Sequence, residues 1–246
     1  MNKKLLLALL LLSAPATTVS STVPGKAPHP ASNECVILLH GLARTASSME
    51  KLANTLEEVG YSVANIDYPS RHHAIPTLAK MAIDQGLSEC REKEATTINF
   101  VTHSLGGILV REYLNKQPIE ELKRVVMLGP PNQGSEVVDK LKNVPGFKAL
   151  NGPAGLQLGT SKKDIPKQLG AVNFDTGIIA GTRSINLILS GYLPGIDDGK
   201  VTVENAKVAG MKDFMTLPVT HPMMMNNDNV IDQTLHFLRQ GYFKRN

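Results

Sequence analysis

Short apolar runs alternate with amphipathic segments along most of this 246-residue chain. The first run is apolar throughout, which is typical of a strand buried on both faces of a sheet. Pro218 lies inside the last run and favours an edge position for it, because proline has no N–H to donate to a second neighbouring strand. The pattern predicts six β-strands, at Cys35–Leu39, Tyr61–Ile66, Ile98–Thr102, Arg124–Leu128, Gly177–Gly181 and Phe214–Thr220.

Apolar residues at helical spacing lie between the predicted strands. They indicate helices over Met49–Val59, Ile75–Ile83, Leu105–Asn115 and Ile231–Leu238. Regular strand–helix alternation with short links predicts the α/β class, with a mostly parallel sheet of about six strands and helices on both faces. The length suits a single domain of this kind.

Residues 130–173 interrupt the alternation. They are rich in Gly, Pro, Lys and Asn, and only Glu136–Leu141 has a helical pattern. A long irregular segment after a core strand is more often a functional excursion than a mere connection. We therefore expect a partial cap over the active face, and the alternative is a surface loop that contacts no substrate.

The N-terminal residues have the pattern of an export signal. Lys3 and Lys4 precede an apolar run of eight residues, and Ala14-Pro15-Ala16 matches an A-x-A cleavage site. Residues 1–16 are thus predicted to be a signal peptide, residues 17–33 a flexible leader and residues 34–246 the folded domain. We expect an exported protein, periplasmic or secreted. We expect no lipid anchor, because no cysteine lies near the cleavage site, and no transmembrane anchor, because no later run is long enough.

The charge of the chain does not indicate a nucleic-acid partner. The formal net charge is +4 and falls to +2 when Lys3 and Lys4 leave with the signal peptide. A basic stripe with interleaved aromatic residues is also missing from the sequence. We expect a small-molecule partner and no nucleic acid.

The two cysteines are consistent with an oxidising compartment. Cys35 begins the first predicted strand, and Cys90 ends the helix before the Ile98–Thr102 strand. In a parallel sheet both positions lie at the edge opposite the carboxyl ends of the strands. A Cys35–Cys90 disulfide there would contribute roughly 3–4.5 kcal/mol on the chain-entropy model. Two buried free thiols are the alternative.

The segment Thr-His-Ser-Leu-Gly-Gly, residues 102–107, carries the clearest chemical signal. It follows the apolar run Ile98–Val101 and opens the Leu105–Asn115 helix. A serine at such a strand–turn–helix junction is typical of a nucleophile elbow, where a sharp turn exposes the hydroxyl and small residues let the helix come close. We interpret Ser104 as a catalytic nucleophile.

A serine hydroxyl needs a base that accepts its proton. His221 is favoured, because it follows the last predicted strand, where a loop returns to the carboxyl edge of the sheet beside Ser104. His72 and His73 follow the second strand on the same face and are a lesser alternative, as substrate contacts.

The base in turn needs an acid that orients it and stabilises its charged form. Asp198 lies in a loop between the last two predicted strands, directly before a glycine. Asp197 is the alternative, because spacing does not separate adjacent carboxylates, and Asp175 is a distant third. The non-catalytic interpretation of the same Asp-Asp-Gly is a plain turn or a cation site.

Two backbone N–H groups are expected to hold the oxyanion that forms when a serine attacks an acyl carbonyl. One belongs to Leu105, directly after the nucleophile. The other belongs to Leu42, in the segment that leaves the first strand, where Gly41 permits the unusual backbone conformation that points an amide into the site.

These segments together resemble the α/β-hydrolase superfamily, and in particular small bacterial lipases and carboxylesterases. The resemblance covers Glu34 to the C-terminus. One departure is Thr102, where the family usually has glycine, so that Gly106 and Gly107 must supply the room. The matching segments are Val36–Leu42, His103–Gly107, Asp198–Val201 and the loop at His221.

The resemblance implies the α/β-hydrolase fold and a triad in the chain order of that family, with Ser104 as nucleophile, Asp198 as acid and His221 as base. Leu42 and Leu105 then form the oxyanion hole. The implied reaction is hydrolysis of carboxylic acyl esters through an acyl-enzyme, without a metal or an organic cofactor.

The leading hypothesis is thus a serine esterase or lipase acting on a small acyl ester or a lipid. Its pocket is expected to be lined from residues 130–173 and from the loop after Ile66, while Met223–Met225 either join that lining or pack under the final helix. An amidase, thioesterase or acyltransferase uses the same triad. A non-catalytic binding protein of this fold is disfavoured by the presence of all three triad residues.

Overall fold

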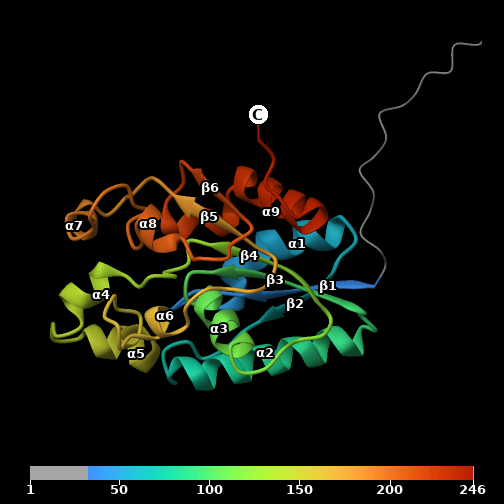
Figure 1. The fold of residues 1–246 in the computed structure, drawn as a ribbon, viewed down its shortest axis with the longest axis horizontal. Helices are drawn as coiled ribbons and strands as arrows, with labels where there is room; N and C mark the ends of the chain where they lie inside the picture. The colour runs from blue at the N-terminus through green and yellow to red at the C-terminus, as the bar shows by residue number, and fades with distance from the viewer. Residues whose placement is uncertain (1–32, 246) are drawn as a thin grey trace, which may run out of the picture.

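The computed structural model describes residues 33–245 (Figure 1). A six-stranded sheet forms its centre, in the order β2-β1-β3-β4-β5-β6, and every neighbouring pair of strands is parallel. The predicted α/β class and the edge position of the last strand are confirmed. The strands are β1 (Glu34–Leu39), β2 (Ser62–Ile66), β3 (Thr97–His103), β4 (Leu122–Leu128), β5 (Thr176–Gly181) and β6 (Asp213–Leu217).

Helices cover both faces of the sheet, which explains why β1 is buried along its whole length and apolar from Cys35 to Leu39. Ile37 and Leu39 of β1 pack against α2 (Ile75–Glu92) and α3 (Leu105–Leu114). Val36 and Leu38 point to the other face, which α1 (Glu50–Glu58) and α9 (Asp228–Gln240) cover. The alternation of side chains along one strand thus builds two separate apolar layers.

The prediction for the last strand was wrong at its end. The strand β6 stops at Leu217, so Pro218 follows it instead of lying inside it. A proline cannot donate to the ladder, and the parallel pairing with β5 ends at the residue before it.

A disulfide joins Cys35 at the start of β1 to Cys90 near the end of α2, with 5.7 Å between the two Cα atoms. Both residues are fully buried. The predicted pairing is confirmed. It ties two points 55 residues apart at the amino end of the sheet, which on the chain-entropy model stabilises the fold by about 4 kcal/mol.

Residues 130–173 are more helical than expected. Besides the predicted α4 (Glu136–Leu141), they contain α5 (Phe147–Leu156) and α6 (Ile165–Gln168). Gly152, at φ +66°, and Pro153 kink α5, which hid its helical pattern in the sequence. Two four-residue helices, α7 (Leu187–Ser190) and α8 (Val203–Ala206), lie between β5 and β6 and were not predicted, because a single turn is too short to show a period.

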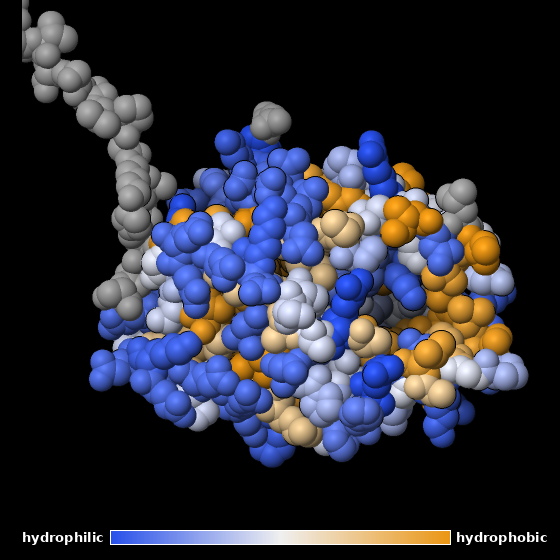
Figure 2. Space-filling model, turned by 180° about the vertical axis from the view of Figure 1, so that it is seen from behind, coloured by the Kyte–Doolittle hydropathy of each residue, from blue (hydrophilic) through white to orange (hydrophobic). Residues whose placement is uncertain are grey.

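Exposed apolar side chains concentrate on one side of the molecule. Figure 2 shows them beside a hollow in the surface, on the side that carries α4, α5 and α7. No helix within the described residues is long and apolar enough to cross a membrane. The predicted signal peptide, residues 1–16, and the leader up to residue 32 lie outside the described residues.

The parallel strands all end at the same edge of the sheet. The register pairs Leu39 of β1 with Thr102 of β3, and His103 of β3 with Leu128 of β4. The loops that leave β1, β3, β4, β5 and β6 therefore start side by side, although they are far apart in sequence. This edge carries the residues that the sequence analysis singled out.

Candidate active site

Ser104 lies on a strained turn between β3 and α3. Its backbone has φ +51° and ψ −115°, a region that residues other than glycine rarely adopt. The turn is held by the N–H of Ser104, which donates to the carbonyl of Leu128 over 2.9 Å. A Cβ atom on Gly106 would lie 2.6 Å from the carbonyl oxygen of Leu39, so only glycine lets α3 start this close to β1.

Thr102 occupies the position where the superfamily that the sequence resembles usually has glycine. Its side chain is fully buried, and its hydroxyl donates to the carbonyl of Val126 over 3.4 Å. A Cβ atom on Gly107 would lie 3.3 Å from that hydroxyl oxygen. The missing side chain of Gly107 therefore supplies room for the β-branched threonine, as the sequence analysis expected.

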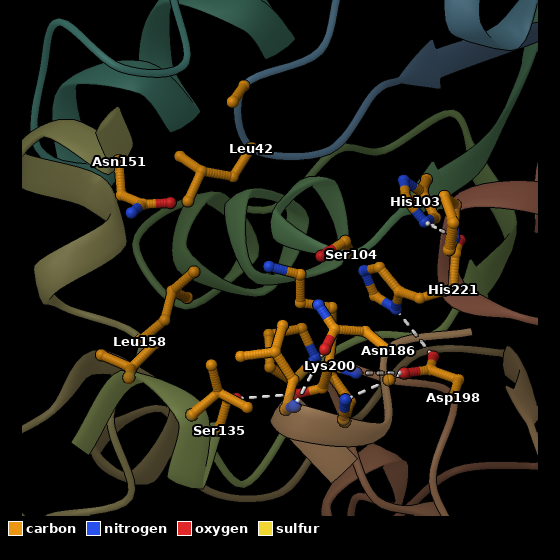
Figure 3. Close-up of a pocket in the computed structure, with 18 of the residues that line it drawn as sticks. Leu42, His103, Ser104, Ser135, Asn151, Leu158, Asn186, Asp198, Lys200 and His221 are labelled. Atoms are coloured by element: carbon orange, nitrogen blue, oxygen red, sulfur yellow. Dashed lines mark hydrogen bonds and ion pairs between the residues drawn. The ribbon is translucent and has the colours of Figure 1, made fainter. Parts of the chain in front are cut away.

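His221 and Asp198 are joined by two hydrogen bonds. The imidazole Nδ1 donates to Oδ2 of Asp198 over 2.7 Å, and the backbone N–H of His221 donates to the carbonyl of Asp198 over 2.9 Å. Oδ1 of Asp198 accepts from the N–H groups of Lys200 and Val201. In Figure 3 the imidazole of His221 lies between the hydroxyl of Ser104 and the carboxylate of Asp198.

The other acids and histidines considered for these roles lie elsewhere. Asp197 accepts hydrogen bonds from Ser190 and Gly199 and so stabilises its own turn. Asp175 pairs with a lysine at the surface. His72 and His73 are exposed and do not line the cavity beside Ser104.

Two glycines leave room for the carboxylate–imidazole pair. Gly129, after β4, has φ +55°, and a Cβ atom there would lie 3.0 Å from Oδ2 of Asp198 and 3.1 Å from Nδ1 of His221. Gly181 ends β5, and a Cβ atom there would lie 2.8 Å from the Cβ of Asp198. Glycine therefore stands at the carboxyl ends of β4 and β5, where the side chains of Asp198 and His221 pass close to the backbone.

His103 contacts His221 and helps to hold the carboxylate–imidazole pair in place. Its Nε2 lies 3.0 Å from the carbonyl oxygen of His221, which can only accept, so the imidazole carries its proton on Nε2. Complete burial lowers the pKa of His103 well below its usual value, and the nearby His221 lowers it further. A neutral ring is therefore held behind His221. A Cβ atom on Gly41 would lie 2.7 Å from Nδ1 of His103, so this ring also requires the glycine.

The loop after β1 passes directly in front of Ser104. Ala43 is in the left-handed region, at φ +56°, and its N–H donates to the hydroxyl of Ser70 over 3.1 Å. The buried ring of His40 stacks on Tyr68 with 4.1 Å between ring centroids and holds the start of the loop. Among the described residues, no protein acceptor is hydrogen-bonded to the N–H of Leu42 or of Leu105.

A cavity of about 440 Å³ opens beside Ser104. The segment 130–173 contributes much of its wall, including Val138, Phe147 and Leu158, and Leu42 and Leu189 add further apolar surface. The loop after Ile66 does not line this cavity, contrary to expectation. Met224 and Met225 are fully buried beneath α9, and Met223 is half exposed. None of these three methionines is among the described residues that line the cavity.

Residues 35–172, more than half of the chain, match the sequence model of the palmitoyl protein thioesterase family. The chain belongs to this family. No curated protein matches it. This family match, together with a fold that solved lipases and esterases share, supports a hydrolase of ester-type substrates.

Solved structures of bacterial lipases and esterases share the fold of this thioesterase-family protein. The mature lipase BlEst2 of Bacillus licheniformis is 19% identical, with a TM-score of 0.65 over 88% of this chain and 96% of the lipase. The metagenomic carboxyl esterase MGS0156 is 18% identical, with a TM-score of 0.64 over 82% of this chain and 68% of the esterase. Phospholipase PlaB of Legionella pneumophila is 19% identical, with a TM-score of 0.60 over 71% and 45% of the two chains. The α/β-hydrolase fold and the lipase and esterase resemblance are confirmed.

Two cations of this family member line the cavity and were not anticipated. Arg44 follows the loop after β1, and Lys200 follows Asp198 by two residues. Burial lowers the pKa of Lys200, the negative charge of Asp198 opposes this shift, and the positive charge of Arg44 adds to it. The two like charges line the same cavity and repel each other, and solvent reduces this repulsion because both residues are exposed.

Arg111 on α3 anchors the 130–173 segment of the thioesterase-family fold at both ends. Its guanidinium donates to the carbonyl of Asn132 over 2.9 Å and to that of Gly170 over 2.7 Å. The side chain is almost fully buried with no carboxylate partner among the described residues, and burial lowers its pKa to about 10. No sequence motif marks this arginine, because most of its partners are backbone carbonyls.

Proposed function

We propose that the protein hydrolyses fatty acyl esters, with Ser104 as nucleophile, His221 as base and Asp198 as acid. The observation that carries the proposal is the 2.7 Å hydrogen bond between Asp198 and an imidazole that faces the hydroxyl of Ser104. The strained turn at Ser104 and the apolar cavity beside it support the same conclusion.

In the first half of the reaction, Ser104 attacks the acyl carbonyl while Nε2 of His221 accepts the hydroxyl proton. Asp198 accepts a hydrogen bond from Nδ1 and stabilises the imidazolium that forms. The N–H groups of Leu42 and Leu105 hold the oxyanion, a role supported by their lack of other acceptors among the described residues.

In the second half, the tetrahedral intermediate collapses. His221 gives its proton to the leaving alcohol, and the acyl group remains on Ser104 as an ester. Water then enters in place of the alcohol, loses a proton to His221 and attacks the acyl-enzyme. His221 then returns that proton to the oxygen of Ser104, the bond between this oxygen and the acyl group breaks, and the fatty acid leaves.

The surface around the cavity supports a substrate with an apolar chain. Most of the exposed large apolar side chains belong to the two segments that line the cavity, 130–173 and 185–196, as Figure 2 shows from one side. A concentration of this kind is typical of a surface that meets apolar material. Its members are Val144, Leu150, Ile185, Ile188, Tyr192 and Ile196.

A thioester is the second candidate substrate, and the family match favours it. The same steps cleave an acyl–sulfur bond, with a thiol as leaving group. The cavity walls touch the acyl chain in either case, so the two candidates differ only at the leaving group.

We further propose that the protein acts outside the cytoplasm. The disulfide between Cys35 and Cys90 supports this location, because disulfides persist in oxidising compartments. The mass of the protein purified from its native host tests the proposal, since cleavage after Ala16 leaves a chain that begins at Thr17.

Hydrolysis of a chromogenic butyryl ester tests the enzymatic proposal directly. We expect activity in the wild type, its loss in Ser104→Ala, and labelling of Ser104 alone by a fluorophosphonate, mapped by mass spectrometry. Ser135→Ala is the matched control, because Ser135 also lines the cavity but donates to the carbonyl of Lys200. Absence of both hydrolysis and labelling would refute a serine hydrolase.

Two substrate series then define the acyl and leaving groups. Esters from acetyl to palmitoyl separate a short-chain esterase from a lipase. Palmitoyl esters and thioesters of the same small leaving group separate the first candidate from the second.

A further inference from the structure

Two positively charged side chains line the cavity beside Ser104, where Asp198 offsets part of their charge. Arg44 and Lys200 both line it, and within the described residues neither forms an ion pair. Among the described residues, Asp198 is the one acidic residue in the lining. Its Oδ2 accepts from His221 and its Oδ1 from two backbone N–H groups, so its hydrogen-bonding capacity is directed away from the cations.

Both cations are attached to the parts of the site that surround the reacting bond. The N–H of Arg44 donates to the carbonyl of Gly41, closing the turn that contains Leu42. The N–H of Lys200 donates to Asp198, and its carbonyl accepts from the hydroxyl of Ser135 over 2.7 Å (Figure 3). Arg44 therefore lies two residues after Leu42, whose N–H is proposed to hold the oxyanion, and Lys200 lies two residues after Asp198, the proposed acid.

The positive charges of Arg44 and Lys200 repel each other. Burial lowers the pKa of Lys200 and of the fully buried His103, and the charge of Arg44 lowers both further. Arg44 and Lys200 are both exposed, so solvent reduces this repulsion without removing it. An anion bound between the two side chains would relieve the repulsion that remains.

We propose that Arg44 and Lys200 bind an anionic group, a phosphate or a carboxylate, in the leaving-group portion of the substrate. This inference rests on the proposed function, because it concerns the substrate of the same cavity. The walls from 130–173 are mostly apolar and suit the acyl chain, so the part of the cavity near the two cations is left for the alcohol or thiol portion. The anion must lie within a few bonds of the acyl group, since both cations belong to loops that reach the reacting bond.

Two matched substrate pairs test this proposal and separate the sources of the anion. Octanoyl glycerophosphate is compared with octanoyl glycerol, and the octanoyl thioester of mercaptopropionate with that of mercaptoethanol. We expect kcat/KM to be about tenfold higher for the anionic member of at least one pair, equivalent to about 1.4 kcal/mol. A preference in the first pair alone indicates a phosphate, and one in the second alone a carboxylate.

Variants assign the preference to the two side chains. In Arg44→Gln/Lys200→Met we expect the anionic-to-neutral ratio of kcat/KM to fall to about one, with the neutral substrate as the internal reference. Arg44→Lys/Lys200→Arg keeps both charges and should keep most of the preference. Lys162→Met/Lys163→Met removes two exposed charges away from the cavity and should leave the ratio as in the wild type.

The inference and the proposed function fail separately. A wild type that cleaves the neutral members as fast as the anionic ones, or a double variant with an unchanged ratio, overturns the inference and leaves the hydrolase intact. If no substrate is cleaved, calorimetry on Ser104→Ala still tests the anion site. There octyl phosphate should bind about tenfold tighter than octyl glucoside, and equal affinities would refute the site.

Discussion

Asp198 accepts hydrogen bonds from both the backbone N–H and the imidazole of His221, so one residue determines the position and the orientation of the other. The backbone bond ties the loop after β6 to the loop after β5. The side-chain bond then sets which nitrogen of the imidazole carries the proton. Nε2 is left as an acceptor facing Ser104, which is the tautomer that a base requires.

Asp198→Asn should lower kcat by roughly four orders of magnitude, because an amide can stabilise the wrong tautomer of His221 and cannot balance the imidazolium charge. Steady-state hydrolysis of a short-chain ester measures the loss, and circular dichroism verifies the fold. Asp197→Asn is the control, since the carboxylate of Asp197 accepts from Ser190 and Gly199 and not from His221, and it should retain most of the wild-type kcat. Equal losses in both variants would contradict the assignment of the acid.

Gly181→Ala should reduce both activity and stability. The added methyl group would lie 2.5 Å from the carbonyl oxygen of Val219 and 2.8 Å from the Cβ of Asp198, so the loop that carries the acid must move. Overpacking of this kind costs about 1–3 kcal/mol. Urea unfolding and kcat are measured together.

The control for this variant is Gly195→Ala. Gly195 has φ +95° and no atom within 4 Å of an added Cβ, so it should lose only about 1–2 kcal/mol from backbone strain and keep its kcat. An active and stable Gly181→Ala variant would show that the site tolerates the displacement.

Arg111→Met should release the 130–173 segment from α3. The substitution leaves the carbonyls of Asn132 and Gly170 without their donor and should destabilise the protein by about 3 kcal/mol. Limited proteolysis should then cut within 130–173 sooner than in the wild type. Arg91→Met, which breaks a surface pair with Glu121, should lose at most about 1 kcal/mol and keep the wild-type cleavage pattern.

Stability should decrease as the pH falls below about 6.5, the ordinary pKa of histidine. Burial lowers the pKa of His103 in the folded protein, so below that pH the unfolded chain binds a proton that the folded protein does not. The contribution of His103 to stability therefore grows as the pH rises and is fully present above about pH 6.5. Burial lowers the pKa of His40 as well, which acts in the same direction.

His103→Gln should make this dependence shallower, measured as the free energy of urea unfolding between about pH 5 and pH 8. His72→Gln changes an exposed histidine and should leave the slope as in the wild type. An unchanged slope in His103→Gln would show that the acid sensitivity arises elsewhere.

The sequence alone predicted the sheet and the position of Ser104, because both depend on local patterns. A strand such as β1, buried on both faces, is apolar at nearly every position, and a serine between a buried strand and a helix must lie on a turn. The pairing of Cys35 with Cys90 also followed from strand order, since parallel strands all start at the same edge.

The tertiary structure alone distinguished Asp198 from Asp197 and revealed Arg44, Lys200 and Arg111. Adjacent carboxylates have the same spacing in sequence, and only the path of the loop turns one toward His221 and the other toward Ser190. Arg111 binds backbone carbonyls, which every residue possesses, and the two cavity cations are isolated charges in sequence. Such contacts join segments distant along the chain, so their geometry exists only once the chain has folded.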